Sequence, residues 1–176
     1  MIRAGFIDRL IRALKLNVNL YEEVEADPGA MGQAMGVVIL SSIAAGIASF
    51  RTGGWSGIFA GAVVALLGWF VWAYLTYLIG TKLLPEPQTQ ATAGQLLRTI
   101  GFSSSPGLIR IIGIIPGLLG ITFFVAGIWM LVAMIIAVRQ ALDYQNTFRA
   151  VVVCLIGWIV QALFFLVLFS LFGKPA

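Results

Sequence analysis

The chain has 176 residues, of which 60% are hydrophobic and only 10% are charged, and its mean hydropathy is +1.01. An ordinary soluble domain carries about 25% charged residues and cannot hide several long apolar runs, so this composition excludes one. The formal charge of +4 does not indicate nucleic-acid binding, because the 11 basic residues stand at the borders of apolar runs instead of forming a stripe among aromatic residues.

The first stretch, residues 2–15, has the pattern of an amphipathic helix. Its apolar residues are Ile2, Phe6, Ile7, Leu10, Ile11 and Leu14, and its basic residues are Arg3, Arg9, Arg12 and Lys15. Such a helix can lie in the membrane interface, with its charges against anionic headgroups and its apolar side below them. It can equally pack against the cytoplasmic face of its own protein, and both interpretations stay open at this point.

An acidic segment follows at residues 21–28, which holds four of the seven carboxylates and ends at Pro28. We interpret it as a turn outside the hydrocarbon, in which Asp27 caps a helix that begins beyond the proline. The candidate residues for contact with a partner are Tyr21, Glu22, Glu23, Glu25 and Asp27. Residues 1–28 are therefore predicted to be cytoplasmic, and residues 29–176 to form a transmembrane domain.

Four apolar runs without Asp, Glu, Lys or Arg follow, and they predict an all-α, polytopic bundle of membrane helices. The stretch 101–138 is interrupted only by Arg110, and as one helix it would reach about twice the hydrocarbon thickness. Pro116-Gly117 supplies a break between two crossings. Five spans result, at about 31–50, 57–80, 96–115, 118–142 and 150–173.

The distribution of Lys and Arg gives the orientation, since cytoplasmic flanks collect basic residues. Five spans with the N-terminus inside place eight basic residues inside and two outside, whereas four spans place eight inside and three outside. Helix length, not charge, therefore decides for five. We predict a multi-pass protein of the cell (inner) membrane, with a cytoplasmic N-terminus and an external C-terminus.

Small residues recur every four positions from just before the second predicted span into that span, at Gly53, Gly57, Gly61 and Ala65. Rows of this kind allow two helix backbones to approach closely in lipid. We expect Gly57 and Gly61 to pack the first two spans together, with a seam between two copies of the chain as the alternative.

Two polar side chains stand out within the spans. Arg110 is a formal charge with apolar residues on both sides, and intramembrane ionisable residues are functional candidates by default. A structural role is the alternative, in which the side chain snorkels or binds freed carbonyls. Gln161 lies at the centre of the last span, where an interhelical hydrogen bond is its expected role and substrate contact the alternative.

A short segment in the third predicted span combines glycine, serine and proline. Its residues are Gly101, Phe102, Ser103, Ser104, Ser105 and Pro106. Proline removes a backbone donor and disfavours helix at the residue before it, while the hydroxyls can satisfy the carbonyls that are left free. A helix entrance or kink is predicted, and a serine nucleophile is not, because the chain has no histidine and no carboxylate in any span.

The order of these parts resembles the Yip1 domain family, in its bacterial form with five spans. The acidic segment before the first span, Gly101-Phe102-Ser103-Ser104-Ser105-Pro106, and the exit Ala137-Val138-Arg139-Gln140-Ala141-Leu142 carry the resemblance. Eukaryotic members bind small GTPases through a long cytosolic region and an Asp-Leu-Tyr-Gly-Pro signature, and this chain has neither. The resemblance therefore implies the architecture and does not extend to GTPase binding.

The leading hypothesis is a non-enzymatic membrane scaffold or accessory subunit, in contact with the lipid bilayer and with a protein partner or a second copy of itself. The alternative is a small transporter or channel that works as an oligomer, lined by Arg110, Gln161 and the serines of the third span. No catalytic, cofactor or metal site is predicted, because histidine is absent and Cys154 is a lone cysteine in an apolar run.

Overall fold

The computed structural model describes residues 5–172, and within these it leaves undescribed the side chains of 51, 52, 164, 165 and 167–172. Every described element is a helix. In chain order they are α1 (Phe6–Leu14), α2 (Val18–Ala26), the 3-10 helix η1 (Pro28–Ala30), α3 (Met31–Ala48), α4 (Phe50–Leu78), the π-helix η2 (Ile79–Leu83), α5 (Ala93–Ser103), the 3-10 helix η3 (Ser105–Ile114), α6 (Leu119–Ala141) and α7 (Thr147–Phe172).

Three stretches of the described chain are long and apolar enough to cross a membrane, namely Pro28–Ala48, Gly53–Leu83 and Leu119–Ala141. They coincide with the first, second and fourth predicted spans, and α7 occupies the place of the fifth. The protein is thus an all-helical, multi-pass membrane protein.

The predicted helix at 96–115 is not a single α-helix. The chain forms α5 and then η3, with the change at Ser104, and Pro106 lies in the first turn of η3. Pro106 lacks an N–H and disfavours the α conformation at Ser105, so the α-helical ladder stops there. The start of α5 also differs from the prediction, because Thr92 and Gln95 form a reciprocal capping box that begins the helix at Ala93.

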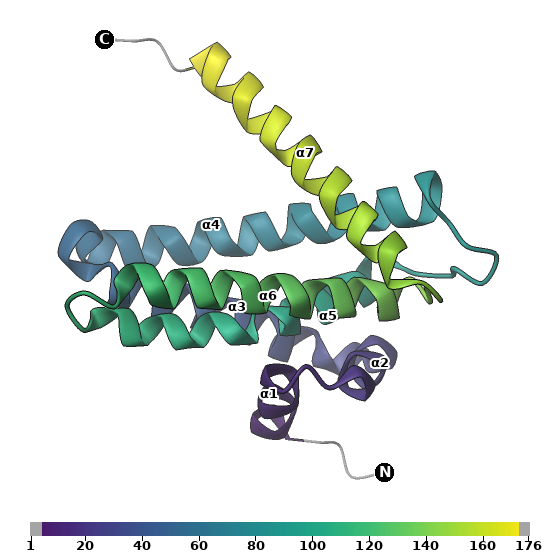
Figure 1. Cartoon of the computed structure of the whole chain (residues 1–176), viewed down its shortest axis with the longest axis horizontal. Helices are drawn as coiled ribbons and strands as arrows, with labels where there is room; N and C mark the ends of the chain where they lie inside the picture. The colour runs from purple at the N-terminus through teal and green to yellow at the C-terminus, as the bar shows by residue number, and fades with distance from the viewer. Residues whose placement is uncertain (1–4, 173–176) are drawn as a thin grey trace.

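The long helices run alongside one another, and two features depart from that bundle (Figure 1). Helix α7 diverges from the others at an angle, whereas α1 and α2 lie across the side of the bundle (Figure 1). Helix α4 is kinked near its start at Gly54, whose φ of 55° lies in the left-handed region that favours glycine. The turn before α6 uses Gly117 in the same way, at φ 87°, as the predicted Pro116-Gly117 break requires.

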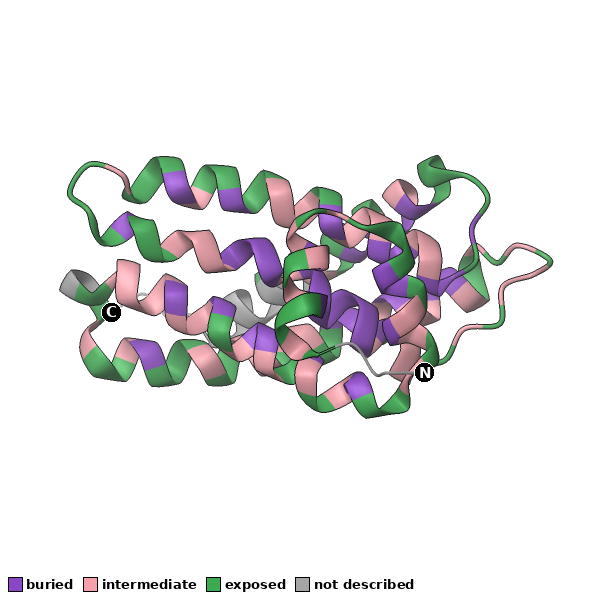
Figure 2. Ribbon diagram, turned by 90° about the horizontal axis from the view of Figure 1, so that it is seen from below, coloured by how far each residue is buried: buried purple, intermediate pink, exposed green. Residues whose placement is uncertain are grey.

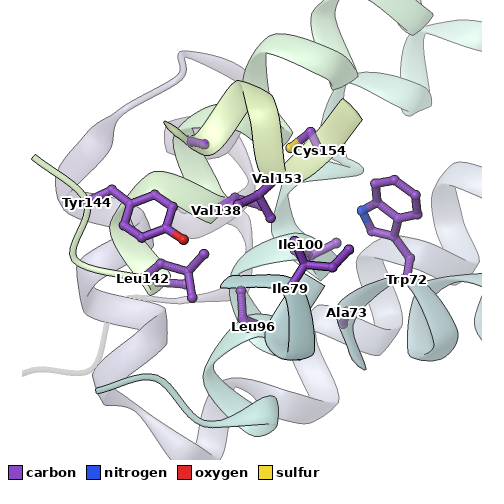
Figure 3. Packing of buried hydrophobic residues seen from close by; sticks show 12 residues of the cluster. Trp72, Ala73, Ile79, Leu96, Ile100, Val138, Leu142, Tyr144, Val153 and Cys154 are labelled. Carbon is purple, nitrogen blue, oxygen red and sulfur yellow. The ribbon is translucent and has the colours of Figure 1, made fainter. Parts of the chain in front are cut away.

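Burial is concentrated at one end of the bundle. Figure 2 shows most of the buried residues gathered in one half of the molecule, whereas the other half is mainly partly or fully exposed, with scattered buried positions. One core cluster joins α4, η2, α5, α6 and α7 through residues such as Ile79, Leu96 and Leu142 (Figure 3). A second cluster joins the first helices to α3, α5 and α6 through Leu20, Tyr21 and others. The remaining surface of the long helices is apolar and open, as expected for helices that face lipid.

Helix α1 packs against its own protein, and ion pairs decide which side faces inward. The Arg9 side chain is only 3% exposed, and it pairs at 2.8 Å with both Glu23 and Asp27. It also donates to Gln33 at 3.1 Å. The side of α1 that carries Arg9 therefore packs against the protein, which is one of the two interpretations of the amphipathic helix. The apolar Ile7 and Ile11 are exposed on α1.

Candidate functional site

A large cavity lies between the long helices and the diverging α7. Its volume is about 1020 Å³, and its walls come from α3, α4, α5, η3, α6 and α7. Among the lining residues at its rim, Val64 and Phe124 are more than half exposed and Ile128 is half exposed, so the cavity opens at the surface of the bundle. Most of the lining is apolar, as in a typical ligand-binding site.

A row of glycines on α4 forms one wall of the cavity. Gly53, Gly57, Gly61 and Gly68 line it, and at each of them a Cβ atom would meet nothing within 4 Å. The expectation that Gly57 and Gly61 pack against another span was therefore wrong for the single chain. Helices α3 and α4 approach closely at Gly46 instead, where a Cβ atom would lie 2.9 Å from Ile58. The glycine row leaves open space because α7 diverges from the bundle (Figure 1).

Arg110 brings a charge into this apolar cavity from η3. Its guanidinium carbon lies 5.2 Å from the ring centroid of Phe123, which also lines the cavity. This cation–π contact offsets part of the cost of removing the charge from water. The Nε atom is buried, however, and it finds no hydrogen-bond acceptor among the described residues. Arg110 is thus a donor without an acceptor, held beside open space.

Two serine hydroxyl groups of the cavity are satisfied within their own helices. Ser42 donates to the Ile39 carbonyl at 2.8 Å, and Ser103 donates to the Ile100 carbonyl at 2.7 Å. Trp72 contrasts with them, since its indole N–H is buried without a described acceptor. Gln161 faces the cavity from α7, and within the described chain no hydrogen bond joins its amide to a neighbouring helix, so its expected interhelical bond is not observed.

The segment at 101–106 divides between the cavity and the core. Ser103 and Ser104 line the cavity, whereas Phe102, Ser105 and Pro106 are buried away from it. Ser105 donates to the Phe102 carbonyl at 2.6 Å, as expected of a hydroxyl that satisfies a carbonyl beside a proline. The segment is a kink at the end of α5, not a helix entrance.

Gly101 fixes the approach of α5 to α3. A Cβ atom on Gly101 would lie 2.7 Å from the Ala34 Cβ and 3.2 Å from its Cα. This glycine, unlike the row on α4, is therefore a true contact between helices.

The acidic segment is a helix, α2, and not the predicted turn. Asp27 does act as a cap, since its carboxylate accepts from the Gly29 N–H at 2.9 Å. Tyr21 is fully buried, and Glu23 and Asp27 are engaged by arginines, so these three have structural roles. Burial raises the pKa of Glu23, but the hydrogen bonds and charges of Arg12 and Arg9 outweigh it and hold that pKa below its usual range.

Two of the candidate acidic residues, Glu22 and Glu25, line a recess. This recess, of about 450 Å³, lies between α2, α5 and the end of α6, with Arg139 and Asp143 on its opposite wall. Glu22 accepts from Gln140 at 2.8 Å, and Glu25 accepts from Gln95 at 2.9 Å. Burial raises the pKa of Glu25 to about 7, with Asp143 and Glu22 adding to the rise and Arg98 opposing it.

Arg98 is a buried residue whose role was not predicted from the sequence. It is 8% exposed, and its Nε donates to the Val24 carbonyl at 2.8 Å while a terminal nitrogen donates to the Glu25 carbonyl. Both carbonyls belong to the last turn of α2, which has no intrahelical donor for them. In the sequence Arg98 counted only as a basic residue at a membrane border. The predicted third span at 96–115 already contained Arg98, and the capping box at Thr92 and Gln95 was the signal that could have moved its start back to Ala93.

No group of three or more His, Cys, Asp or Glu residues that could hold a metal ion occurs among the residues that the structure describes. The fold and the cavity define a multi-pass α-helical membrane protein with a pocket inside the bundle. The chain belongs to the Yip1 domain family, because the model of the Yip1 domain matches residues 21–169. The match runs from α2 into α7. Comparisons with curated proteins and with solved structures give no match.

Proposed function

We propose that this protein is a non-enzymatic membrane scaffold or accessory subunit that crosses the bilayer five times and presents residues 5–27 to the cytoplasm. The third crossing consists of α5 and η3. With a rise of about 1.5 Å per α residue and about 2.0 Å per 3-10 residue, the two reach about 36 Å together, and the hydrocarbon core is about 30 Å thick. The N-terminus is then cytoplasmic, and the C-terminus lies outside.

The observation that carries the proposal is the rigid attachment of α1 and α2 to the membrane bundle. Arg9 joins α1 to α2 and α3, and Arg98 joins α2 to α5. Buried, charge-assisted hydrogen bonds of this kind hold elements in one arrangement. The two helices therefore support a fixed surface beside the membrane, which is what a protein that positions a partner requires.

The recess lined by Glu22, Glu25, Arg139 and Asp143 lies on this surface, and its charges suit a basic group on a partner. Three carboxylates, Glu22, Glu25 and Asp143, face it against one guanidinium, Arg139. An excess of negative charge in a concave site favours a basic side chain on the partner. We infer that a partner protein inserts a Lys or Arg residue there.

Co-purification from mild detergent after chemical cross-linking tests this proposal. The wild-type chain should recover a partner or a second copy of itself, and the double variant Glu22→Gln, Asp143→Asn should recover at least five-fold less. Asp8→Asn is the matched control, because Asp8 is an exposed acid on α1 away from the recess. A chain that is always recovered alone and monomeric would contradict the scaffold proposal.

The cavity supports a second candidate function, a small transporter or channel. It brings Arg110, Gln161 and Ser104 together in one space. Flux of a fluorescent anion into liposomes that contain the purified protein tests it. Replacement of Arg110 by alanine should reduce the flux, and flux that is absent, or equal in the variant, counts against transport.

A further inference from the structure

We propose that the intramembrane cavity is a binding site for one phospholipid with an anionic headgroup, whose phosphate is held by Arg110 and whose acyl chain lies along the glycine row of α4. This inference goes beyond the scaffold proposal. It uses the same placement in the membrane but does not depend on a protein partner.

The length of the cavity suits an acyl chain. Beyond the kink at Gly54, its lining on α4 extends from Gly57 to Trp72, which at about 1.5 Å per residue corresponds to about 22 Å. The hydrocarbon core of a bilayer is about 30 Å thick, so the cavity accompanies most of that depth. A compact soluble ligand would fill only a small part of such a space, whereas an extended hydrocarbon chain can follow it.

The cavity follows α4 because this helix carries small residues along the wall that it forms. Glycine at 53, 57, 61 and 68, together with the small Ala65, leaves the cavity side of α4 without large side chains, and a Cβ atom at each of these glycines would meet nothing within 4 Å. Aromatic rings of Trp69, Trp158 and Phe124 form other parts of the lining. The result is a continuous apolar channel along the helix, open at a rim of exposed residues through which a lipid can enter sideways.

Arg110 supplies the recognition of charge. It lies four residues before the end of η3, which corresponds to about 8 Å of depth, so that a flexible guanidinium stem reaches the phosphate layer. An unpaired donor in hydrocarbon costs several kcal/mol, and the buried Nε of Arg110 has no acceptor among the described residues. A phosphodiester provides acceptor oxygens and the opposite charge, which pair well with a guanidinium. In an anionic phospholipid no cation on the same headgroup balances that charge, whereas the choline of phosphatidylcholine does.

A transmembrane helix of a partner is the competing occupant, since glycine rows also accept helices. A helix would have to carry a carboxylate to the depth of Arg110 in order to satisfy it, and acids are rare in spans. Every phospholipid carries its phosphate at the membrane interface. The charge and the glycine row together therefore favour the lipid.

Native mass spectrometry of the protein in mild detergent tests the site. The probes are phosphatidylglycerol, phosphatidylcholine with the same acyl chains, and inorganic phosphate, each added alone. We expect one phosphatidylglycerol per chain at low concentration, at least ten-fold weaker retention of phosphatidylcholine, and no retention of phosphate. Arg110→Gln should remove the preference between the two lipids, Arg110→Lys should preserve it, and Lys82→Gln, an exposed charge outside the cavity, should leave it unchanged.

The glycine row has a matched pair of variants. Gly61→Leu places a side chain in the cavity, and Gly120→Leu places the same side chain at an exposed position of α6 outside it, with open space at both. Gly61→Leu should lower the retention of phosphatidylglycerol at least five-fold, and Gly120→Leu should not change it.

Quenching of tryptophan fluorescence by phosphatidylglycerol with brominated acyl chains gives a second readout, because Trp69, Trp72 and Trp158 line the cavity. It should saturate at one lipid per chain. Retention that is equal for both lipids and unaffected by Arg110→Gln would overturn the inference. So would retention of phosphate alone, or a protein dimer with no bound lipid. Loss of partner recovery with lipid binding intact would overturn the scaffold proposal only.

Discussion

Arginine side chains that are withdrawn from water hold the N-terminal helices on the bundle. Arg9 is surrounded by two carboxylates and an amide oxygen, and Arg98 donates to two carbonyls at the end of α2. A buried guanidinium that keeps its hydrogen bonds is tolerated, whereas a buried carbonyl that loses its donor is costly. We therefore expect these two residues to have a larger effect on stability than the more exposed Arg149, which pairs with Glu86.

Replacement of Arg98 by methionine tests this difference. The variant keeps the apolar stem but leaves the carbonyls of Val24 and Glu25 without donors, and we expect the free energy of unfolding to fall by about 2–4 kcal/mol. Denaturant titration in detergent, followed by circular dichroism, measures it. Arg149→Met is the control, because Arg149 is 45% exposed in its pair with Glu86, and its effect should be below about 1 kcal/mol. Equal effects of both variants would contradict the role of Arg98.

Glu25 predicts a pH dependence of stability. Its pKa of about 7 lies above the ordinary value of 4.5, so the folded state binds more protons than the unfolded state between these values. Stability should therefore decrease as the pH rises from about 5 to about 7. The charged groups near Glu25 are two acids, Asp143 and Glu22, which raise its pKa further, and one base, Arg98, which lowers it. The pKa of Glu23 is lowered instead, so Glu23 stabilises the folded state at neutral pH. That stabilisation is lost only when the pH falls below the ordinary carboxyl range.

Thermal unfolding of Glu25→Gln at pH 5 and pH 8 measures this effect. The wild type should show a lower Tm at pH 8 than at pH 5, and the variant should show a smaller difference, because glutamine carries no proton to lose. Asp8→Asn should behave like the wild type. A wild-type Tm that is constant or rises over this range would count against the burial of Glu25.

At the scale of elements, glycines have two opposite roles that look the same in the sequence. Gly101 lets α5 approach α3, and Gly80 admits Leu142, whereas Gly57 faces open space. The end of the long α4–η2 stretch is held by Tyr144, whose hydroxyl donates to the Leu84 carbonyl at 2.7 Å. A glycine row in the sequence shows only where side chains are missing. Whether another helix packs there or a cavity remains depends on where the neighbouring helices lie.

Alanine substitution separates the two kinds of glycine. Gly101→Ala forces its Cβ against Ala34, and we expect it to lower the free energy of unfolding by about 1–3 kcal/mol. Gly57→Ala meets nothing, so helix propensity should raise stability by up to about 1 kcal/mol. Unfolding of both variants in detergent gives the comparison. A shift in the same direction for both would contradict the packing described.

At the scale of the whole molecule, charge-free apolar runs predicted the helices that cross the membrane, because lipid leaves few alternatives to a helix of that length. The break at Pro116-Gly117 followed from the same reasoning. The change from α5 to 3-10 geometry could not be placed, since Pro106 predicts a kink without saying which helix type follows. The amphipathic pattern also could not show which side of α1 faces inward, because Arg9 finds its partners in α2 and α3 and not in solvent.

The candidate site was predictable as a set of residues but not as a cavity. Arg110, Gln161, Ser103, Ser104, Gly57 and Gly61 were all candidates, and all of them line the cavity. Their convergence depends on how α4, α5, η3 and α7 are arranged around one space, and no local sequence pattern encodes that arrangement.

Five crossings with α5 and η3 as the third are the central claim, and labelling of single cysteines tests it most directly. In a Cys154→Ala background, a membrane-impermeant maleimide added to intact cells should label Pro116→Cys and a cysteine placed after Ala176. It should label Gln88→Cys only after the membrane is opened. Labelling of positions 88 and 116 from the same side, or of both chain ends from the same side, would contradict the claim.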